Sequence, residues 1–324
     1  MKPFESPLGP LMEDYLCYRV CLGYNAKGLR SILSRLDRYI REQAAGLGEL
    51  TPGFFLGLKV RHQNKQTTFN ALLLAARGFF AYLERRQIIS ENPLLDVQSY
   101  PPKAFIPFVF SPEQTDALLS AAQKNIRKHD PACFLRDYAA YLCIVLLARC
   151  GMRIGEPLRL SLPDYRADER TLYIEKTKFH KNRLIPVPAG AASELDIYLR
   201  VRGAWVAGDN PYLFPGKHGR PLNVKNVSRL FEQSVLQMGL DRKKSIIGNT
   251  SFGRPTPHSL RHSFAVNTLK AVRDRGGSPQ NALPVLSGYL GHVKYRYTAV
   301  YLKVLDAEHR NGLVDFAIGR QEEI

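Results

Sequence analysis

Residues 288–304, GYLGHVKYRYTAVYLKV, set a histidine and several tyrosines in a basic helical pattern. The Leu290–Gly291 pair is typical of a helix end, and the run TAVYLKV predicts a second helix. That helix carries Tyr301, nine residues after His292. A tyrosine between valine and leucine is equally typical of an amphipathic helix whose hydroxyl faces water. This segment alone does not distinguish a catalytic Tyr301 from one that only packs in a helix. The other segments of the chain are needed to choose between the two.

Length and charge predict a two-domain protein that binds a polyanion. The chain has 324 residues, which is long for one compact core. Its 46 Lys and Arg residues outnumber its 29 Asp and Glu residues, so the net charge is +17. Neutralising phosphates with such an excess releases condensed counterions and gives strong, salt-dependent affinity. Nucleic acid is favoured over an anionic membrane surface, because no basic amphipathic segment stands apart from the globular pattern.

The sequence shows no signal for export or membrane insertion. No uninterrupted apolar run reaches the ~18 residues of a membrane span, and the N-terminal MKPFESPLGPLMEDYL lacks the apolar segment of a secretory signal. Five cysteines, an odd set without a CxxC pair, favour reduced thiols over disulfides or a zinc site. We therefore expect a cytoplasmic protein that is not bound to a membrane.

Residues 1–98 are expected to form a helical domain. Apolar residues three and four apart run through LMEDYLCYRVCLGY and LRSILSRLDRYIREQAAGL, break at a turn around Thr51–Gly53 and resume in a helix from Lys65. The proline-containing segment VQSYPPKAFIPFVF predicts an extended linker, so residues 99–110 separate this domain from a second one at 111–324. The basic residues of the first domain fit either a DNA clamp or an ordinary bundle with a solvated basic face.

The second domain begins with a helix capped by Ser111 and continues with an apolar helix at 133–150 that predicts a buried spine. In GMRIGE, directly after this spine, Glu156 is spaced to hydrogen-bond and orient Arg153, unless the two form an ordinary surface pair. TLYIE and LIPVP predict a β-hairpin with the basic tip KTKFHKNR. Lys178 lies on that tip, where a lysine can enter an active site or a groove. The alternative is a solvent-exposed loop that serves solubility.

The C-terminal third contains one more candidate. Residues 190–240 predict two scaffold helices, and RKKSIIGNTSFGRP (242–255) predicts either a nucleic-acid contact or a flexible loop. TPHSLRHSF begins a helix with Thr256 as its N-cap. His258 and Arg261, three residues apart, share one face near the positive N-terminal end of that helix.

These histidines favour a phosphate site over a metal site. His258 and His262 are four residues apart, but a hydrolytic zinc helix has glutamate where Ser259 stands, and Arg261 lies between the two histidines. The candidate segments are also nearly free of the carboxylates that hold Mg²⁺. We therefore expect no metal and no cofactor. Two arginines can instead grip a phosphodiester, with a phenol as nucleophile and a mobile lysine as proton donor.

This order of residues resembles the tyrosine recombinase family, of the phage integrase type. GMRIGE is similar to the family's first arginine box, TKFHKNRLIPV to its β-hairpin lysine segment, HSLRHSFA to its HxxR box, and LGHVKYRYTAVY to its histidine and nucleophile segment. The resemblance covers residues 108–324 and, more loosely, the first domain. It implies a mainly α fold with a small β-sheet: an N-terminal SAM-like core-binding domain and an α+β catalytic domain that form a C-shaped DNA clamp.

The resemblance also implies roles for the basic residues. Arg153 and Arg261 would clamp the scissile phosphate, and Glu156 would support them. Lys178 would be the general acid to the leaving 5′ oxygen. Two neighbouring lysines are the alternatives for that role: Lys176 and Lys181.

The imidazoles and the phenol complete the implied site. His258 would act as an acid/base, His292 would donate a hydrogen bond to the phosphate, and Tyr301 would form a 3′ phosphotyrosine. Tyr295 and Tyr297 are rival nucleophiles, but only Tyr301 has the family's spacing from His292.

The implied function is site-specific recombination of duplex DNA without metal or nucleotide, in integration, excision or resolution of a mobile element. Implied partners are double-stranded recombination sites and further copies of the chain, a dimer on one site and a tetramer in the synapse. The segment after Tyr301 is amphipathic and is expected to pack against a neighbouring protomer. Two alternatives stay open: a type IB topoisomerase-like relaxing enzyme, and a catalytically inactive DNA-binding regulator of the same fold.

Overall fold

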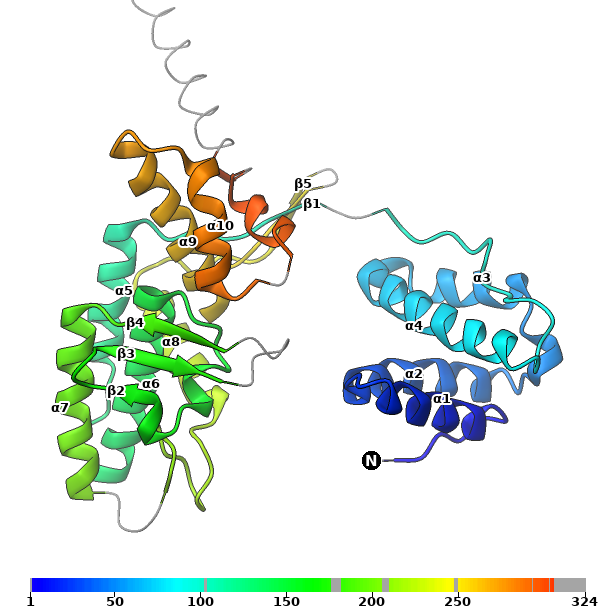
Figure 1. Ribbon diagram of the computed structural model, residues 1–324, viewed down its shortest axis with the longest axis horizontal. Helices are drawn as coiled ribbons and strands as arrows, with labels where there is room; N and C mark the ends of the chain where they lie inside the picture. Colours follow the sequence, from blue (N-terminus) through cyan, green and yellow to red (C-terminus); the bar gives the residue numbers. More distant parts are fainter. Residues whose placement is uncertain are drawn as a thin grey trace, which may run out of the picture. The chain divides into compact units, whose positions relative to one another are not determined.

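The structure is a computed structural model that describes residues 2–101, 104–175, 182–205, 210–247, 250–292, 294–302 and 304–305. The chain divides into two compact units, Met1–Lys103 and Ala104–Ile324. Each unit buries its own hydrophobic clusters. Unit 1 is drawn from blue to cyan in Figure 1.

Unit 1 is a bundle of helices. They are α1 (Gly9–Cys21), α2 (Ala26–Glu42), α3 (Pro52–Arg61) and α4 (Gln66–Arg85). The expected turn at Thr51–Gly53 is instead the start of α3. Thr51 Oγ1 accepts a hydrogen bond from Phe54 N at 3.5 Å, and Pro52 occupies the first turn. Threonine followed by proline suits a helix N-terminus as well as a turn, and the helix wins because it buries Phe55 and Leu58.

One of the basic side chains of α4 serves the interior of unit 1. Arg77 Nε donates to the carbonyl oxygen of Leu94 at 3.1 Å, and its Nη2 donates to that of Val97 at 2.8 Å. Both acceptors lie in the segment that follows α4. The Arg77 guanidinium therefore satisfies two backbone carbonyls and attaches the C-terminal segment of unit 1 to α4, the longest helix of that unit.

Unit 2 is built around α6 (Pro131–Cys150), in which residues 139–148 are all buried. This is the buried spine that the sequence predicts. By length and mean hydropathy, 1.5, it is the one helix among the described residues that resembles a membrane span, and here it forms the core. Four helices pack around or beside it (Figure 1): α5 (Pro112–Lys124), α7 (Ala189–Trp205), α8 (Val224–Gln237) and α9 (Pro257–Asp274).

The starts of these helices follow the sequence signals. Ser111 Oγ accepts from Gln114 N at 3.1 Å, and Gln114 Oε1 accepts from Ser111 N at 3.0 Å, so α5 begins with the predicted capping box. α9 begins directly after Thr256, as predicted, with Ser259 Oγ accepting from Thr256 N at 3.1 Å. These local contacts fix where α9 presents its first turn.

An antiparallel sheet of order β2-β3-β4 covers part of the core. Its strands are β2 (Tyr165–Arg166), β3 (Thr171–Ile174) and β4 (Arg183–Pro186). The predicted hairpin is β3–β4, with Ile174 opposite Arg183. The hairpin tip at 176–181, which includes Lys178, lies outside the described residues.

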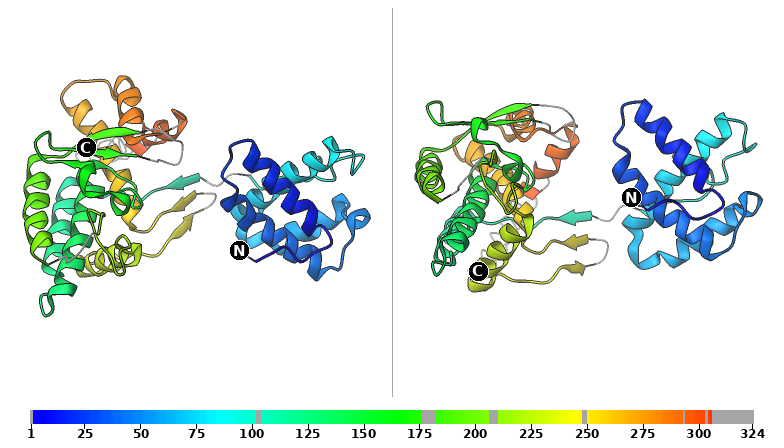
Figure 2. Two further views of the ribbon diagram at one scale, coloured as in Figure 1. Left: turned by 60° about the horizontal axis from the view of Figure 1, so that its bottom comes forward. Right: turned by 90° about the horizontal axis from the view of Figure 1, so that it is seen from below.

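A second sheet joins two segments that the sequence analysis treats as a linker and a loop. Its order is β1-β6-β5, with β1 (Ala104–Ile106), β5 (Ser245–Ile247) and β6 (Thr250–Phe252) side by side (Figure 2). β1 pairs in parallel with β6, and β5 pairs antiparallel with it. The extended backbone expected around residue 104 is therefore part of a sheet, because β1 pairs with the distant β6. The loop expected at 242–255 contains the hairpin of β5 and β6.

The chain that follows β1 is fastened to α9. Phe110 N donates to Ser263 Oγ at 2.8 Å, and the carbonyl oxygen of Phe110 accepts from Asn267 Nδ2 at 3.0 Å. Ser263 and Asn267 are four residues apart and so lie on one face of the helix. Two α9 side chains thus pair both backbone groups of one residue.

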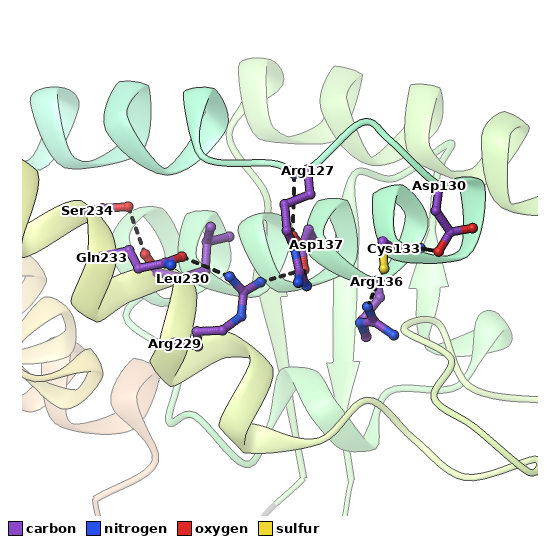
Figure 3. Close-up of polar contacts among 9 residues, drawn as sticks. All are labelled: Arg127, Asp130, Cys133, Arg136, Asp137, Arg229, Leu230, Gln233 and Ser234. Carbon is purple, nitrogen blue, oxygen red and sulfur yellow. Dashed lines mark hydrogen bonds and ion pairs between the residues drawn. The ribbon is translucent and has the colours of Figure 1, made fainter.

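A buried carboxylate ties α6 to α8 (Figure 3). Asp137 accepts from Arg127 Nε at 2.7 Å and Nη2 at 3.0 Å, and from Arg229 Nη2 at 2.6 Å. Burial raises the pKa of Asp137, but the two guanidiniums outweigh burial and keep its pKa below the ordinary value. The ionised carboxylate holds α8 and the segment before α6 in register with the spine.

Two left-handed glycines end the helices that lead into the candidate site. Gly151 closes α6 at φ +58°, and Gly291 closes α10 (Pro279–Leu290) at φ +64°. Residues 296–302 and 304–305 are helical, which confirms the predicted second helix around Tyr301.

We expect Gly151→Ala to destabilise unit 2. A Cβ at this position would lie 2.5 Å from Phe264 Cδ1, and the backbone has φ +58°. The left-handed conformation alone costs a residue with a side chain ~1–2 kcal/mol, and the clash adds to this. The measurement is the urea midpoint followed by circular dichroism.

Gly203→Ala in α7 is the matched control, because no heavy atom lies within 4 Å of its added Cβ. Alanine favours a helix interior by ~0.5–1 kcal/mol over glycine, so this midpoint should stay or rise. Equal midpoints for the two variants would contradict the packing described at Gly151.

Candidate active site

Arg261 lies at the centre of the candidate site. Its side chain is only 1% exposed, Nη1 donates to the carbonyl oxygen of Gly151 at 2.7 Å, and Nη2 donates to that of Leu290 at 2.6 Å. Burial, with the charge of Arg153, lowers the pKa of Arg261 to about 10, so the guanidinium stays charged at neutral pH. One side chain of α9 therefore joins the ends of α6 and α10.

Arg153 lies beside it on the turn after α6. Its Nη1 donates to Glu156 Oε1 at 3.0 Å, and its Nη2 donates to the carbonyl oxygen of Gly291 at 3.1 Å. Glu156 Oε2 also accepts from Arg153 N at 2.8 Å. The two arginines thus bind consecutive carbonyls, those of Leu290 and Gly291. Glu156 is 3% exposed, so the pair is not an ordinary surface ion pair.

A third arginine supports this pair from β4. Arg183 Nη2 donates to Glu156 Oε2 at 2.9 Å. A Cβ on Gly291 would lie 2.9 Å from Arg183 Nη1, so the glycine leaves the space that the guanidinium fills. Burial raises the pKa of Glu156, but Arg183 and Arg153 together hold it below its ordinary value. The carboxylate is therefore an ionised bridge between the hairpin and the turn after α6.

Tyr301, on the C-terminal helical segment, lies close to the same group of side chains. Its side chain is 3% exposed, and its Oη lies 3.2 Å from His262 Nδ1. The ring centroids of His262 and His292 are 5.7 Å and 6.3 Å from that of Tyr301. Burial raises the pKa of Tyr301 above its ordinary value, although the nearby Arg261 acts in the opposite direction. The hydroxyl is a neutral phenol at pH 7.

His292 fastens the same helical segment at a second point. Its Nδ1 lies 2.8 Å from Oγ1 of Thr298, a fully buried residue one turn before Tyr301. Burial, followed by the charges of Arg261 and Arg153, lowers the pKa of His292 to about 4. The imidazole is therefore neutral at pH 7, and its Nδ1 is occupied by the threonine.

His258 lies on the first turn of α9, edge to face with His262 at a centroid distance of 4.6 Å. Burial, with the charges of Arg261 and Arg153, lowers the pKa of His258 below its ordinary value. The two imidazoles are thus in contact, and both are neutral at pH 7.

The structure brings most of the predicted residues into one cluster: Arg153, Glu156, His258, Arg261, His292 and Tyr301. Lys178 and its alternatives lie outside the described residues. The rival tyrosines differ from Tyr301 in burial, since Tyr295 is 49% exposed and Tyr297 is 47% exposed.

Sequence reasoning missed three contributors. His262 was considered only as a zinc ligand, although its four-residue spacing from His258 places both on one helix face. Arg183 carries no local signal, because its partner Glu156 is 27 residues away in another element. Thr298 carries one, since it is a polar residue one helical turn before Tyr301 and six residues after its partner His292.

The chain is similar to known recombinases over nearly its whole length. The phage integrase family matches residues 109–308. A putative integrase/recombinase, y4rB, of Sinorhizobium fredii is 37% identical over 294 residues, covering 90% of this chain and 91% of that protein. Tyrosine recombinase XerC of Alcanivorax borkumensis is 30% identical over 269 residues, covering 82% of this chain and 78% of that protein.

Solved structures share the fold. A lambda integrase dimer bound to a COC′ core site matches with TM-score 0.64 at 18% identity, covering 91% of this chain and 76% of that one. XerH recombinase in a post-cleavage complex matches with TM-score 0.63 at 20% identity, covering 83% and 73%. These matches confirm the predicted mainly α architecture, with two small sheets in the described part of the chain instead of one.

We expect Arg183→Met to destabilise the protein by ~3–5 kcal/mol, because removing one partner leaves a buried carboxylate short of charge compensation. Methionine keeps much of the side-chain volume and removes the contact to Glu156. The free energy of unfolding is measured in urea. A double variant with Glu156→Gln should recover part of the loss.

Arg166→Met is the control, since the Arg166–Glu169 pair is about half exposed on both sides. Such surface pairs contribute ~0–1 kcal/mol. If the two arginine variants lose the same stability, Arg183 is not the buried brace described here.

Proposed function

The chain belongs to the phage integrase family and is a tyrosine-type site-specific recombinase, and on this premise we propose that it cuts and rejoins duplex DNA through a phosphotyrosine at Tyr301. One observation carries the proposal. The Tyr301 hydroxyl contacts His262 inside a pocket where Arg153 and Arg261 both act on it electrostatically.

In this proposal the scissile phosphate is bound by Arg153 and Arg261. The two carbonyl contacts of Arg261 use two of the five N–H donors of a guanidinium. The other donors and the positive charge stabilise the pentacoordinate transition state. Glu156 orients Arg153. His292, held by Thr298 through Nδ1, donates to the phosphate from Nε2.

Access requires the nucleophile helix to move. Arg261 is 1% exposed and Tyr301 is 3% exposed, so neither side chain is open to a phosphate from solvent. A phosphate reaches the guanidiniums when residues 296–305 shift by enough to open the site. The contacts at His262 and Thr298 open while the phosphate enters and form again once it is bound.

The proposed reaction exchanges one ester for another. Tyr301 Oη forms a bond to phosphorus as the bond from phosphorus to the 5′ oxygen breaks. Lys178 protonates the leaving 5′ oxygen, and His258 serves as an acid/base beside the phosphate. Attack by a 5′ hydroxyl reverses these steps. Phenolate, with a pKa ~10, leaves more easily than a sugar alkoxide, so resealing needs no nucleotide and no metal.

The partner is double-stranded DNA at specific recombination sites. Support comes from the net charge of +17 and from structural relatives that are bound to DNA. In this proposal residues 1–98 bind the core site, 99–110 connect, and 111–324 catalyse. Two protomers bind one site and four form the synapse, in the cytoplasm on the nucleoid, and the reaction integrates, excises or resolves a mobile element.

We expect Tyr301→Phe to abolish covalent capture of DNA. The wild-type protein is incubated with a pool of duplexes nicked just downstream of the cleavage position, from which the short fragment that carries the new 5′ hydroxyl diffuses away and leaves the adduct trapped. Protein–DNA adducts are recovered under denaturing conditions, and the attached ends are sequenced to reveal the site.

Tyr295→Phe and Tyr297→Phe are the matched controls and should retain the adduct, because both side chains are about half exposed while Tyr301 is buried. An adduct that survives in Tyr301→Phe and disappears in either control would assign the nucleophile to another residue and refute the proposed site.

Binding of duplex DNA should weaken steeply with salt. A protein that contacts 6–10 phosphates loses ~10³-fold or more in affinity between 50 mM and 200 mM salt. Fluorescence anisotropy with the mapped site measures the slope of log affinity against log salt. A flat response over this range would contradict a clamp built on phosphate contacts.

A further inference from the structure

His262 is the residue in contact with the nucleophile, and the proposed function gives it no task. Its Nδ1 lies 3.2 Å from Tyr301 Oη. It follows Arg261 directly on α9, so its backbone is fixed by the same buried guanidinium that organises the pocket. On the premise of the proposed function, we propose that His262 accepts the phenolic proton of Tyr301 during cleavage and returns it during resealing.

A proton acceptor is needed because Tyr301 is not ionised beforehand. Burial raises the pKa of the phenol, so the hydroxyl is neutral at pH 7. A neutral phenol is a weak nucleophile, and it becomes a strong one when a base removes its proton as the new bond forms. A base must be within hydrogen-bond reach of that proton, and His262 Nδ1 meets this condition.

The neighbouring imidazoles are less well placed for this transfer. His292 uses Nδ1 for Thr298, and its ring lies parallel to that of Tyr301 at 6.3 Å. His258 contacts the ring of His262 at 4.6 Å. Within the described part of the chain, the hydrogen bond to Tyr301 Oη is made by His262. His258 is therefore a second imidazole behind the acceptor.

The surrounding charges make this transfer depend on the substrate. Burial comes first, then His258, Arg261 and His292, in lowering the pKa of His262 to about 3. Such an imidazole is neutral and free to accept a proton, but it is a weak base while the pocket is empty. A phosphodiester brings a negative charge next to the same cations, which raises the pKa of the imidazole. The base becomes effective when the phosphate is bound.

The protons and bonds balance without another reagent. As Oη bonds to phosphorus, its proton passes to His262 Nδ1, and the electron pair of the breaking bond goes to the 5′ oxygen. That oxygen takes a proton from the general acid assigned to the hairpin tip. In resealing, the 5′ hydroxyl attacks, and His262 H⁺ protonates the departing phenolate. One imidazole thus serves as base and then as acid.

The test compares His262→Ala and His262→Asn in single-turnover cleavage of the mapped site. Asparagine can hydrogen-bond the hydroxyl but cannot take up its proton at neutral pH. We expect both variants to lose ~10²-fold or more in cleavage rate, the usual contribution of a general base. If asparagine restores the wild-type rate, His262 only positions the phenol and the proposal is overturned.

A substrate with sulfur in place of the bridging 5′ oxygen separates the base from the acid. A thiolate leaves without protonation, so this substrate rescues variants that lack the general acid. We expect no rescue of His262→Ala. Rescue would show that His262 serves the leaving group, which also overturns the proposal.

The pH dependence gives a third readout. Without a base, Tyr301 attacks only as preformed phenolate, whose fraction rises tenfold per pH unit below its pKa. The cleavage rate of His262→Ala should therefore rise more steeply with pH than that of the wild type. Parallel profiles would contradict the assignment. Melting temperature and DNA affinity are measured for both variants, and the asparagine variant decides the question if the alanine variant unfolds.

Failure of this inference is distinguishable from failure of the proposed function. Covalent capture that depends on Tyr301 but is unaffected by either His262 variant removes the inference alone. Absence of any Tyr301-dependent adduct in the wild-type protein removes both.

Discussion

The pocket depends on one buried guanidinium. Arg261 binds the carbonyl oxygens of Gly151 and Leu290, which are the open ends of α6 and α10. Helix C-termini carry unsatisfied carbonyls and a partial negative charge, so a cation there is stabilised on both counts. The same contacts bring the turn after α6, the first turns of α9 and the segment after α10 together. Residues from three distant parts of the sequence therefore share one pocket.

The site carries an excess of positive charge, and repulsion among its cations costs free energy. A buried carboxylate and neutral histidines reduce that cost. Three arginines, Arg153, Arg183 and Arg261, surround a single buried carboxylate, Glu156. The histidines are neutral at pH 7, because burial and the nearby arginines lower their pKa values. The positive charges are incompletely compensated, so an anion would be bound favourably here. In the proposed reaction that anion is the scissile phosphate, and the same charges support its binding and the transition state.

Local signals in the sequence predicted most of the helices, and the family resemblance pointed to the residues of the candidate site. The caps at Ser111 and Thr256 and the glycine after Leu290 act within one turn, so they are readable without a fold. The strand at 104–106 was missed because it pairs with residues 250–252, a segment far away in the sequence. The structural role of Arg183 was missed because its guanidinium fits beside Gly291 only where that residue has no Cβ. The two residues are far apart in the sequence, so no local pattern shows this contact.

Ser263 and Asn267 on α9 hold both backbone groups of Phe110. Ser263 follows His262, whose Nδ1 lies 3.2 Å from Tyr301 Oη. Phe110 is fully buried and lies four residues after β1, which pairs with β6. Within unit 2, loss of the Ser263 hydroxyl would therefore loosen the segment after β1 and the helix that carries Arg261 together.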